Sequence, residues 1–152
     1  MDISVKIGSI LEDDADAIAL NLFEGVQTPG GATGAVDQAL GGTITDLVSA
    51  GDFKGKARET AVLYPKGGVS ARRILLVGLG KKEEFSLDRA RQAAGVVAKR
   101  AQELGVKRLT TIVHGSGAGG LDPARAAQAM VEGSLLGTYQ FNTFKTTNRE
   151  EV

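Results

Sequence analysis

The sequence predicts a layered α/β domain built on a mixed, largely parallel β-sheet. Three observations lead to this fold class. The second half of the chain alternates apolar runs with amphipathic segments, in the order strand, helix, strand, helix. The run Ile74–Val77 is continuously apolar, as expected of a central strand covered on both faces. The 21 glycines stand in small clusters between these segments, which suits tight strand-to-helix connections.

Length and composition indicate one soluble domain. The chain has 152 residues, of which 42% are hydrophobic and 24% charged. Its 18 basic residues balance 18 acidic ones, which argues against a domain devoted to nucleic acid or to a membrane surface. The absence of cysteine excludes disulfides, thiolate metal sites and cysteine nucleophiles. No secretory signal or membrane-spanning run is found, so we expect a cytoplasmic protein with no membrane partner.

Two alternating segments at the start of the chain predict half-buried strands. The first covers residues 2–10, and the second covers residues 16–25, where Ile18, Leu20 and Leu22 share one face. The acidic residues between them predict a solvated turn. They are Glu12, Asp13, Asp14 and Asp16. Residues 28–53 then form a glycine-bracketed stretch that predicts helix, with four inward residues. These are Val36, Leu40, Leu47 and Val48.

The elements of the second half have clearer ends. Strands are expected within residues 56–65, 72–80 and 107–115. A helix over 86–105 would begin at Ser86 as N-cap, and the last helix would begin at Asp122 with Pro123 in its first position. The residues of this last helix expected to face the sheet are Met130, Val131 and Leu135.

The loop between the last strand and the last helix is the main candidate for a ligand site. Gly115, Gly117 and Gly120 match G-x-G-x-x-G, in which glycines let backbone amides approach a pyrophosphate. That fingerprint, however, belongs to a first strand–helix turn with another strand after it, and no further strand follows here. A plain crossover loop is therefore favoured over a ligand loop. The candidate loop consists of Gly115, Ser116, Gly117, Ala118, Gly119 and Gly120.

Other chemistry-bearing residues have simpler interpretations. His114 is the one histidine and has no nucleophile motif near it, and the acidic run lacks the spaced ligands of a metal site. Pairs of basic residues could contact phosphates, although a solvated surface is the default. They are Arg72–Arg73, Lys81–Lys82, Lys99–Arg100 and Lys107–Arg108. The residues alone therefore assign no catalytic residue and no metal ligand.

The ordered motifs resemble the N-terminal domain of the leucyl aminopeptidases, also called cytosol aminopeptidases (peptidase family M17). The most specific segments are "RRILLVGLGKKEEF", the following "LDRARQAAG", and "EGSLLGTYQFNTFKT". Phe144 stands where the family has tyrosine, a mild departure. The resemblance covers nearly the whole chain. It implies a macro-domain-like, three-layer α/β/α fold for residues 1–140, with residues 141–152 beginning a linker to a catalytic domain that this chain does not include.

The resemblance also implies where the chemistry lies. In this family two divalent metals, Zn or Mn, and the catalytic lysine and arginine belong to the catalytic domain, whose "NTDAEGR" motif does not occur here. We therefore expect these 152 residues to be inactive alone, as a non-catalytic accessory domain of a metallo-aminopeptidase that removes N-terminal amino acids from peptides.

The expected partners follow from the same resemblance. They are the chain's own catalytic domain and further copies in a hexamer, where this domain would contribute to assembly and active-site access. Tyr139, Phe141 and Phe144 are candidates for the interdomain contact. Two alternatives stay open: binding of an ADP-ribose-type ligand, as macro domains do, and DNA binding, which the balanced net charge does not support.

Overall fold

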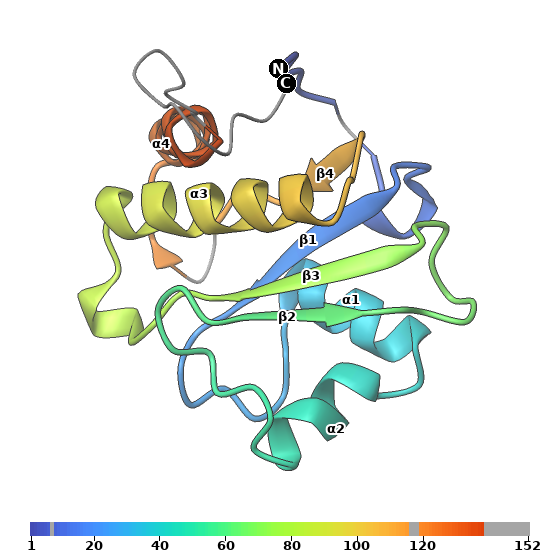
Figure 1. Cartoon of the computed structure of the whole chain (residues 1–152). Coiled ribbons are helices and arrows are strands. Elements are labelled where there is room, and N and C mark those ends of the chain that lie inside the picture. The colour runs from blue at the N-terminus through green and yellow to red at the C-terminus, as the bar shows by residue number, and fades with distance from the viewer. Residues whose placement is uncertain (7, 116–118, 139–152) are drawn as a thin grey trace, which may run out of the picture.

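A mixed four-stranded sheet forms the middle of the molecule in the computed structural model, which describes residues 1–6, 8–115 and 119–138. The strands are β1 (Ala17–Leu22), β2 (Thr60–Leu63), β3 (Arg73–Gly78) and β4 (Leu109–Thr111). Their order is β2-β3-β1-β4. β1 runs parallel to β3 and β4, while β2 pairs antiparallel with β3. The predicted mixed, largely parallel sheet is confirmed (Figure 1).

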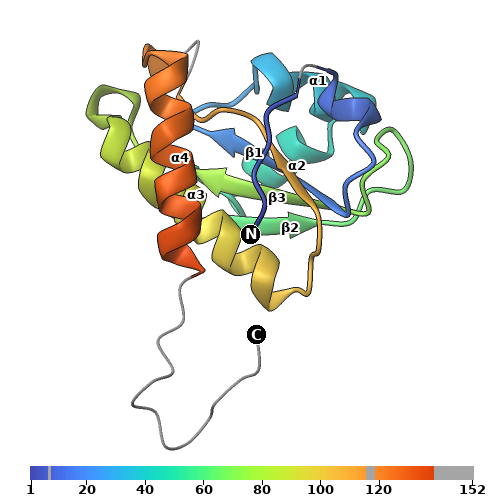
Figure 2. The same cartoon turned by 90° about the horizontal axis from the view of Figure 1, so that it is seen from above.

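Helices cover both faces of this sheet. Helices α1 (Gly31–Ala39) and α2 (Thr43–Ser49) lie on one face, and α3 (Leu87–Glu103) lies on the other (Figure 1). Helix α4 (Pro123–Gly137) packs against α3, as the view from above shows (Figure 2). Two short 3-10 helices, η1 (Ile10–Glu12) and η2 (Lys82–Glu84), complete the elements. The predicted three-layer α/β/α arrangement is therefore confirmed.

Alternation along the strands divides the core into two clusters. On the side of α1 and α2, Ile18, Leu20 and Leu76 pack with Val36, Ile44 and Phe53. On the side of α3, the small side chain of Ala19 and the larger Leu75 and Val77 pack against three residues of the helix. These are Ala93, Val97 and Ala101. The continuous apolar run of β3 is thus explained, because its successive side chains enter opposite clusters.

Local capping signals were predicted correctly. The Ser86 side chain accepts a hydrogen bond from the Arg89 amide at the start of α3, and Asp122 accepts from the Arg125 amide at the start of α4. These bonds satisfy amides that have no partner within the helix.

No helix in the part of the chain that the structure describes combines the length and apolar character needed to cross a bilayer.

Residues 28–53 are helical, as predicted, and form two helices because Gly41 and Gly42 adopt positive φ between them. Two other expectations were wrong. The described residues of segment 2–10 form no strand, and η1 begins at Ile10. Leu135 does not face the sheet: its side chain is 49% exposed, since α4 turns its small residues toward α3.

Glycines bring α3 and α4 unusually close together. A Cβ atom on Gly133 would collide with the backbone carbonyl of Arg91, and one on Gly137 would collide with Gly95. Gly95 in turn lies against the backbone of Gly133. The spacing of Gly133 and Gly137 places both on one side of α4, so the backbones of the two helices meet there.

Candidate functional site

The carboxyl ends of the parallel strands meet at one edge of the sheet. Phe23 follows β1, Leu79 and Gly80 follow β3, and the segment from Ile112 to Gly115 follows β4. The Glu24 amide donates to the Gly80 carbonyl at 2.9 Å, which ties the first two connections together. In open α/β sheets this edge is where ligands bind. It is also the edge that holds the predicted glycine loop.

Two phenylalanine rings fill the space beside this loop. Phe23 and Phe85 stack edge to face, with ring centroids 5.2 Å apart at 90°. Gly115 is buried, and a Cβ atom there would collide with the Phe85 ring and with Leu121. A Cβ atom on Gly119 would come within 3.3 Å of Phe85 and 3.4 Å of Phe23. Gly115 and Gly119 therefore leave room for the two aromatic rings.

The loop is only partly within the described structure. Gly115 and Gly120 adopt φ of +87° and +72°, a conformation that favours glycine and so explains these two residues by backbone geometry as well. Ser116, Gly117 and Ala118 of the candidate loop lie outside the described residues.

His114 is fully buried directly before the loop. Its Nδ1 lies 2.8 Å from Nδ2 of Asn21, near the end of β1, and its backbone amide donates to Sδ of Met130 at 3.2 Å. Because the Asn21 amide nitrogen is a donor, Nδ1 accepts and the proton of the neutral ring lies on Nε2. Nε2 has no hydrogen-bond partner within the described ranges. Burial lowers the pKa of His114 to about 4, so the ring is neutral at pH 7.

This environment does not suit a general base. The imidazole nitrogen able to accept a proton is bonded to Asn21, and the ring is enclosed between β1 and α4. Sequence reasoning missed Asn21. The one available signal was a polar amide in an otherwise apolar strand, a type of residue that is buried only when hydrogen-bonded.

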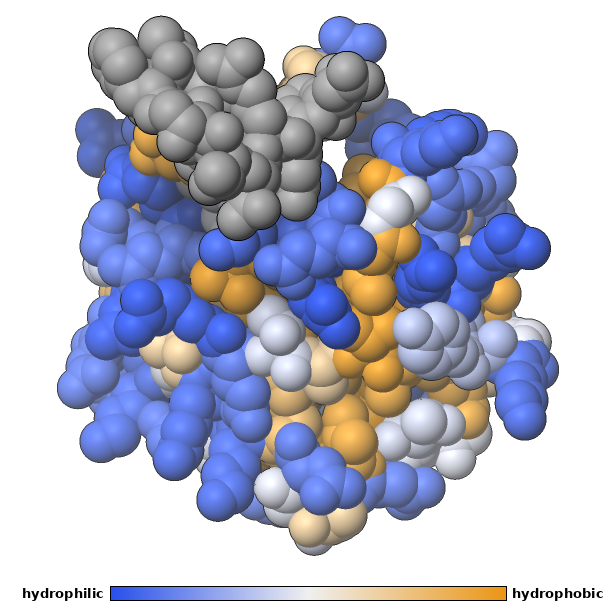
Figure 3. All heavy atoms as spheres, viewed as in Figure 1, coloured by the Kyte–Doolittle hydropathy of each residue, from blue (hydrophilic) through white to orange (hydrophobic). Residues whose placement is uncertain are grey.

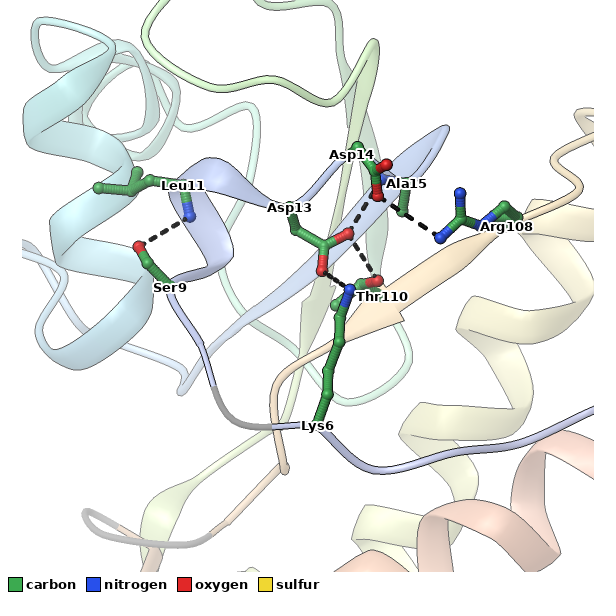
Figure 4. Close-up of polar contacts among 8 residues, drawn as sticks. All are labelled: Lys6, Ser9, Leu11, Asp13, Asp14, Ala15, Arg108 and Thr110. Carbon is green, nitrogen blue, oxygen red and sulfur yellow. Dashed lines mark hydrogen bonds and ion pairs between the residues drawn. The ribbon is translucent and has the colours of Figure 1, made fainter.

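The acidic turn before β1 is only partly solvated: Glu12 and Asp14 are exposed, whereas Asp13 and Asp16 form structural contacts. Asp13 is buried. It forms an ion pair with Lys6 at 2.6 Å and accepts from the Ala15 amide and from the Thr110 hydroxyl, each at 2.9 Å (Figure 4). The hydrogen bond from Lys6 is the largest influence that lowers the pKa of Asp13.

The neighbouring acids bind the start of β4. Asp16 accepts from the backbone amides of Lys107 and Arg108, both at 3.1 Å, and Asp14 lies 3.4 Å from the Arg108 guanidinium. These carboxylates therefore anchor β4 and the N-terminal segment to β1. Among the residues that the structure describes, no three His, Asp or Glu side chains gather closely enough to hold a metal ion.

Residues from two of the predicted basic pairs lie beside the amino ends of the parallel strands, opposite the end that holds the glycine loop. Arg72, Arg73 and Lys107 line a cleft of about 570 Å³ together with Asp16 and Tyr64. Arg73 donates to the Leu104 carbonyl at 3.0 Å, so part of the positive charge is directed at the negative end of α3. With Asp16 also present, the cleft is mixed in charge. The face of the molecule seen in the direction of Figure 1 is largely hydrophilic, apart from an apolar strip near its middle (Figure 3).

Comparison with known proteins identifies the family to which the chain is related. Residues 19–148 match the model of the cytosol aminopeptidase family, N-terminal domain. A probable cytosol aminopeptidase of Roseiflexus castenholzii is 34% identical over 151 residues, which cover 99% of this chain and 28% of that protein. One of Alkaliphilus oremlandii is 35% identical over 98% of this chain and 30% of its own length. The chain thus spans less than a third of these relatives.

Solved structures share the fold. A mutant of tomato leucine aminopeptidase aligns with a TM-score of 0.66 and 21% identity, over 90% of this chain and 28% of that enzyme. The macrodomain of Mycobacterium tuberculosis DarG aligns with a TM-score of 0.70 and 16% identity, over 84% of this chain and 86% of that one. At these sequence identities, the structural similarity shows only that the chain has a macro-domain-like fold. Membership of a family is shown by the family model and by the aminopeptidases that are 34% and 35% identical. The chain belongs to the cytosol aminopeptidase family and corresponds to its N-terminal domain.

Proposed function

We propose that this chain is the non-catalytic accessory domain of a metal-dependent leucyl aminopeptidase and contributes to assembly and active-site access. The observation that carries the proposal is the match of residues 19–148 to the N-terminal domain of the family, in a chain that spans only 28–30% of its relatives. The proposal requires that the reading frame continues into a catalytic portion. That portion would hold two divalent ions, Zn or Mn, and would remove N-terminal amino acids from peptides.

The environment of the candidate residues supports the proposal that catalysis belongs to another part of the protein. His114 is neutral and enclosed, Asp13 forms contacts with Lys6 and Thr110, and Gly115 and Gly119 pack on phenylalanine rings. Each of these groups has a structural role that needs no substrate. The complete protein would act in the cytoplasm as a homo-oligomer, a hexamer by the family resemblance.

The proposal is tested by removing residues 1–138 from the longer polypeptide. We expect sedimentation velocity to show smaller species than the complete protein forms, together with slower release of leucine from a leucyl chromogenic substrate. A truncated protein that sediments and hydrolyses like the complete one would contradict a role in assembly and access.

Binding of an ADP-ribose-type ligand stays an open alternative that only the fold favours. Phe85 and Leu121 occupy the space against Gly115, so the described part of the loop is explained by packing. Titration calorimetry with ADP-ribose tests this alternative, and heat of binding that disappears in Gly119→Ala would support it. DNA binding likewise stays a prediction, since the basic cleft also contains Asp16 and the end of α3.

A further inference from the structure

Exposed apolar side chains of the described chain gather on the side of the molecule formed by the N-terminal segment, β4 and α4. The exposed fractions are 68% for Met1, 47% for Ile3, 91% for Val5, 37% for Val113, 49% for Leu135 and 70% for Leu136. Tyr64, the remaining large exposed apolar residue, directly follows β2, which is the edge strand farthest from β4. Contiguous exposed apolar side chains mark interaction surfaces more often than isolated ones do.

Side-chain contacts hold these three segments next to one another. Lys6 pairs with Asp13, and Asp13 accepts from Thr110 in β4, which holds the N-terminal segment beside that strand. The His114 amide donates to Met130, which holds the connection after β4 against α4. Figures 1 and 2 both show residues 1–6 and α4 on this same side of the molecule.

Packing within the domain leaves the last turns of α4 uncovered. The residues of α4 that face α3 are small or flexible: Ala126, Ala129, Met130 and Gly133 are buried. Leu135 and Leu136 belong to the same helix, yet no described element covers them. Burial of leucine side chains is favourable, so two exposed leucines at the end of a helix favour a further contact.

We infer that this surface, defined by Ile3, Val5, Leu135 and Leu136, is the docking surface for the catalytic portion of the same polypeptide. The inference rests on the proposed function and names its contact surface. Helix α4 ends at Gly137, next to the two leucines, and the relatives are more than three times as long as this chain, which corresponds to their N-terminal domain.

Hydrogen exchange of the backbone amides of residues 131–138 tests the inference in two proteins, the 152-residue chain and the longer polypeptide. In the longer protein we expect these amides to exchange at least about tenfold more slowly, because docking must open before they exchange. The double variant Leu135→Glu/Leu136→Glu should abolish this difference. The matched control is Tyr64→Glu, which alters an exposed apolar residue on the opposite edge and should leave the difference intact.

Several outcomes would overturn the inference. Equal exchange in both proteins shows that the catalytic portion does not cover α4. Protection that depends on protein concentration assigns the surface to a second copy instead. Thermal unfolding of the 152-residue double variant checks that its fold is unchanged, as expected for residues that are already 49% and 70% exposed. Leucine release by the longer protein separates the two claims: a protected but inactive protein contradicts the proposed function alone, and an active but unprotected one contradicts the docking surface alone.

Discussion

Asp13 and His114 are buried polar residues that hold the connections around β1, and each does so in one charge state. Asp13 acts as a carboxylate, because Lys6, Ala15 and Thr110 all donate to it. His114 acts as a neutral ring, because burial disfavours its charged form. A buried group that needs one charge state makes the stability of the fold depend on pH.

The contribution of Asp13 should disappear in acid. Its pKa in the folded chain lies below the ordinary value of 3.8, so the stabilisation is complete above pH 3.8 and is lost as the pH falls through the folded pKa. Asp13→Asn should lower the free energy of unfolding by about 1–2 kcal/mol at neutral pH and by progressively less below 3.8. Urea denaturation at several pH values measures this. Asp14→Asn is the control, since its exposed ion pair should contribute less than about 0.5 kcal/mol.

The contribution of His114 should change at higher pH. The unfolded chain binds a proton below pH 6.5, whereas the folded chain resists protonation down to about 4. Stability should therefore fall as the pH drops from 6.5 toward 4, by on the order of 3 kcal/mol in total. In His114→Gln, which cannot titrate, this slope should be absent from the same denaturation series. A variant that keeps the wild-type slope would show that another group causes it.

At the scale of elements, the pairing of α3 with α4 depends on the absence of side chains. Gly133 and Gly137 let α4 approach the backbone of α3 at Arg91 and Gly95, and this approach sets the direction in which α4 presents Leu135 and Leu136. A larger residue at the contact would push the helices apart even though it would favour helix formation.

Gly133→Ala tests this close contact. In an exposed helix the change would stabilise by up to about 1 kcal/mol, whereas collision with the Arg91 carbonyl should destabilise the domain by about 1–3 kcal/mol. Thermal unfolding followed by circular dichroism distinguishes these opposite signs. Gln128→Ala, on the exposed face of α4, should leave the midpoint nearly unchanged. A Gly133→Ala protein more stable than wild type would refute the close approach.

Sequence reasoning predicted the elements whose signals are local. The apolar run of β3 and the caps Ser86 and Asp122 each depend on neighbouring residues, and the structure confirms them. It failed where distant segments decide the outcome. Alternation at Ile3 and Val5 predicts a strand, but the described part of that segment pairs with no strand and is held through Lys6.

The same distinction applies to the candidate site. The sequence shows the glycine pattern from Gly115 to Gly120, but it does not show that Gly115 and Gly119 pack against Phe23 and Phe85, because those rings come from connections far away along the chain. Asp13 was likewise assigned to a solvated turn, since Thr110 follows it by 97 positions. The interdomain candidates Tyr139, Phe141 and Phe144, and the linker 141–152, lie outside the described residues and stay predictions.

At the scale of the whole molecule, both faces of the sheet are covered while the side formed by the N-terminal segment and α4 keeps exposed apolar side chains. The buried polar residues Asp13 and His114, in contrast, form side-chain contacts within the fold. This distribution agrees with the proposal that the domain works by contact with the rest of an aminopeptidase.

Amino-acid release by the purified 152-residue chain tests most directly the claim that this domain is non-catalytic. A leucyl chromogenic substrate is incubated with the chain in the presence of Mn²⁺ or Zn²⁺, next to the longer polypeptide as a positive control. We expect no release above background from the chain and metal-dependent release from the longer protein. Metal-dependent turnover by the 152 residues that survives repurification would contradict a non-catalytic domain.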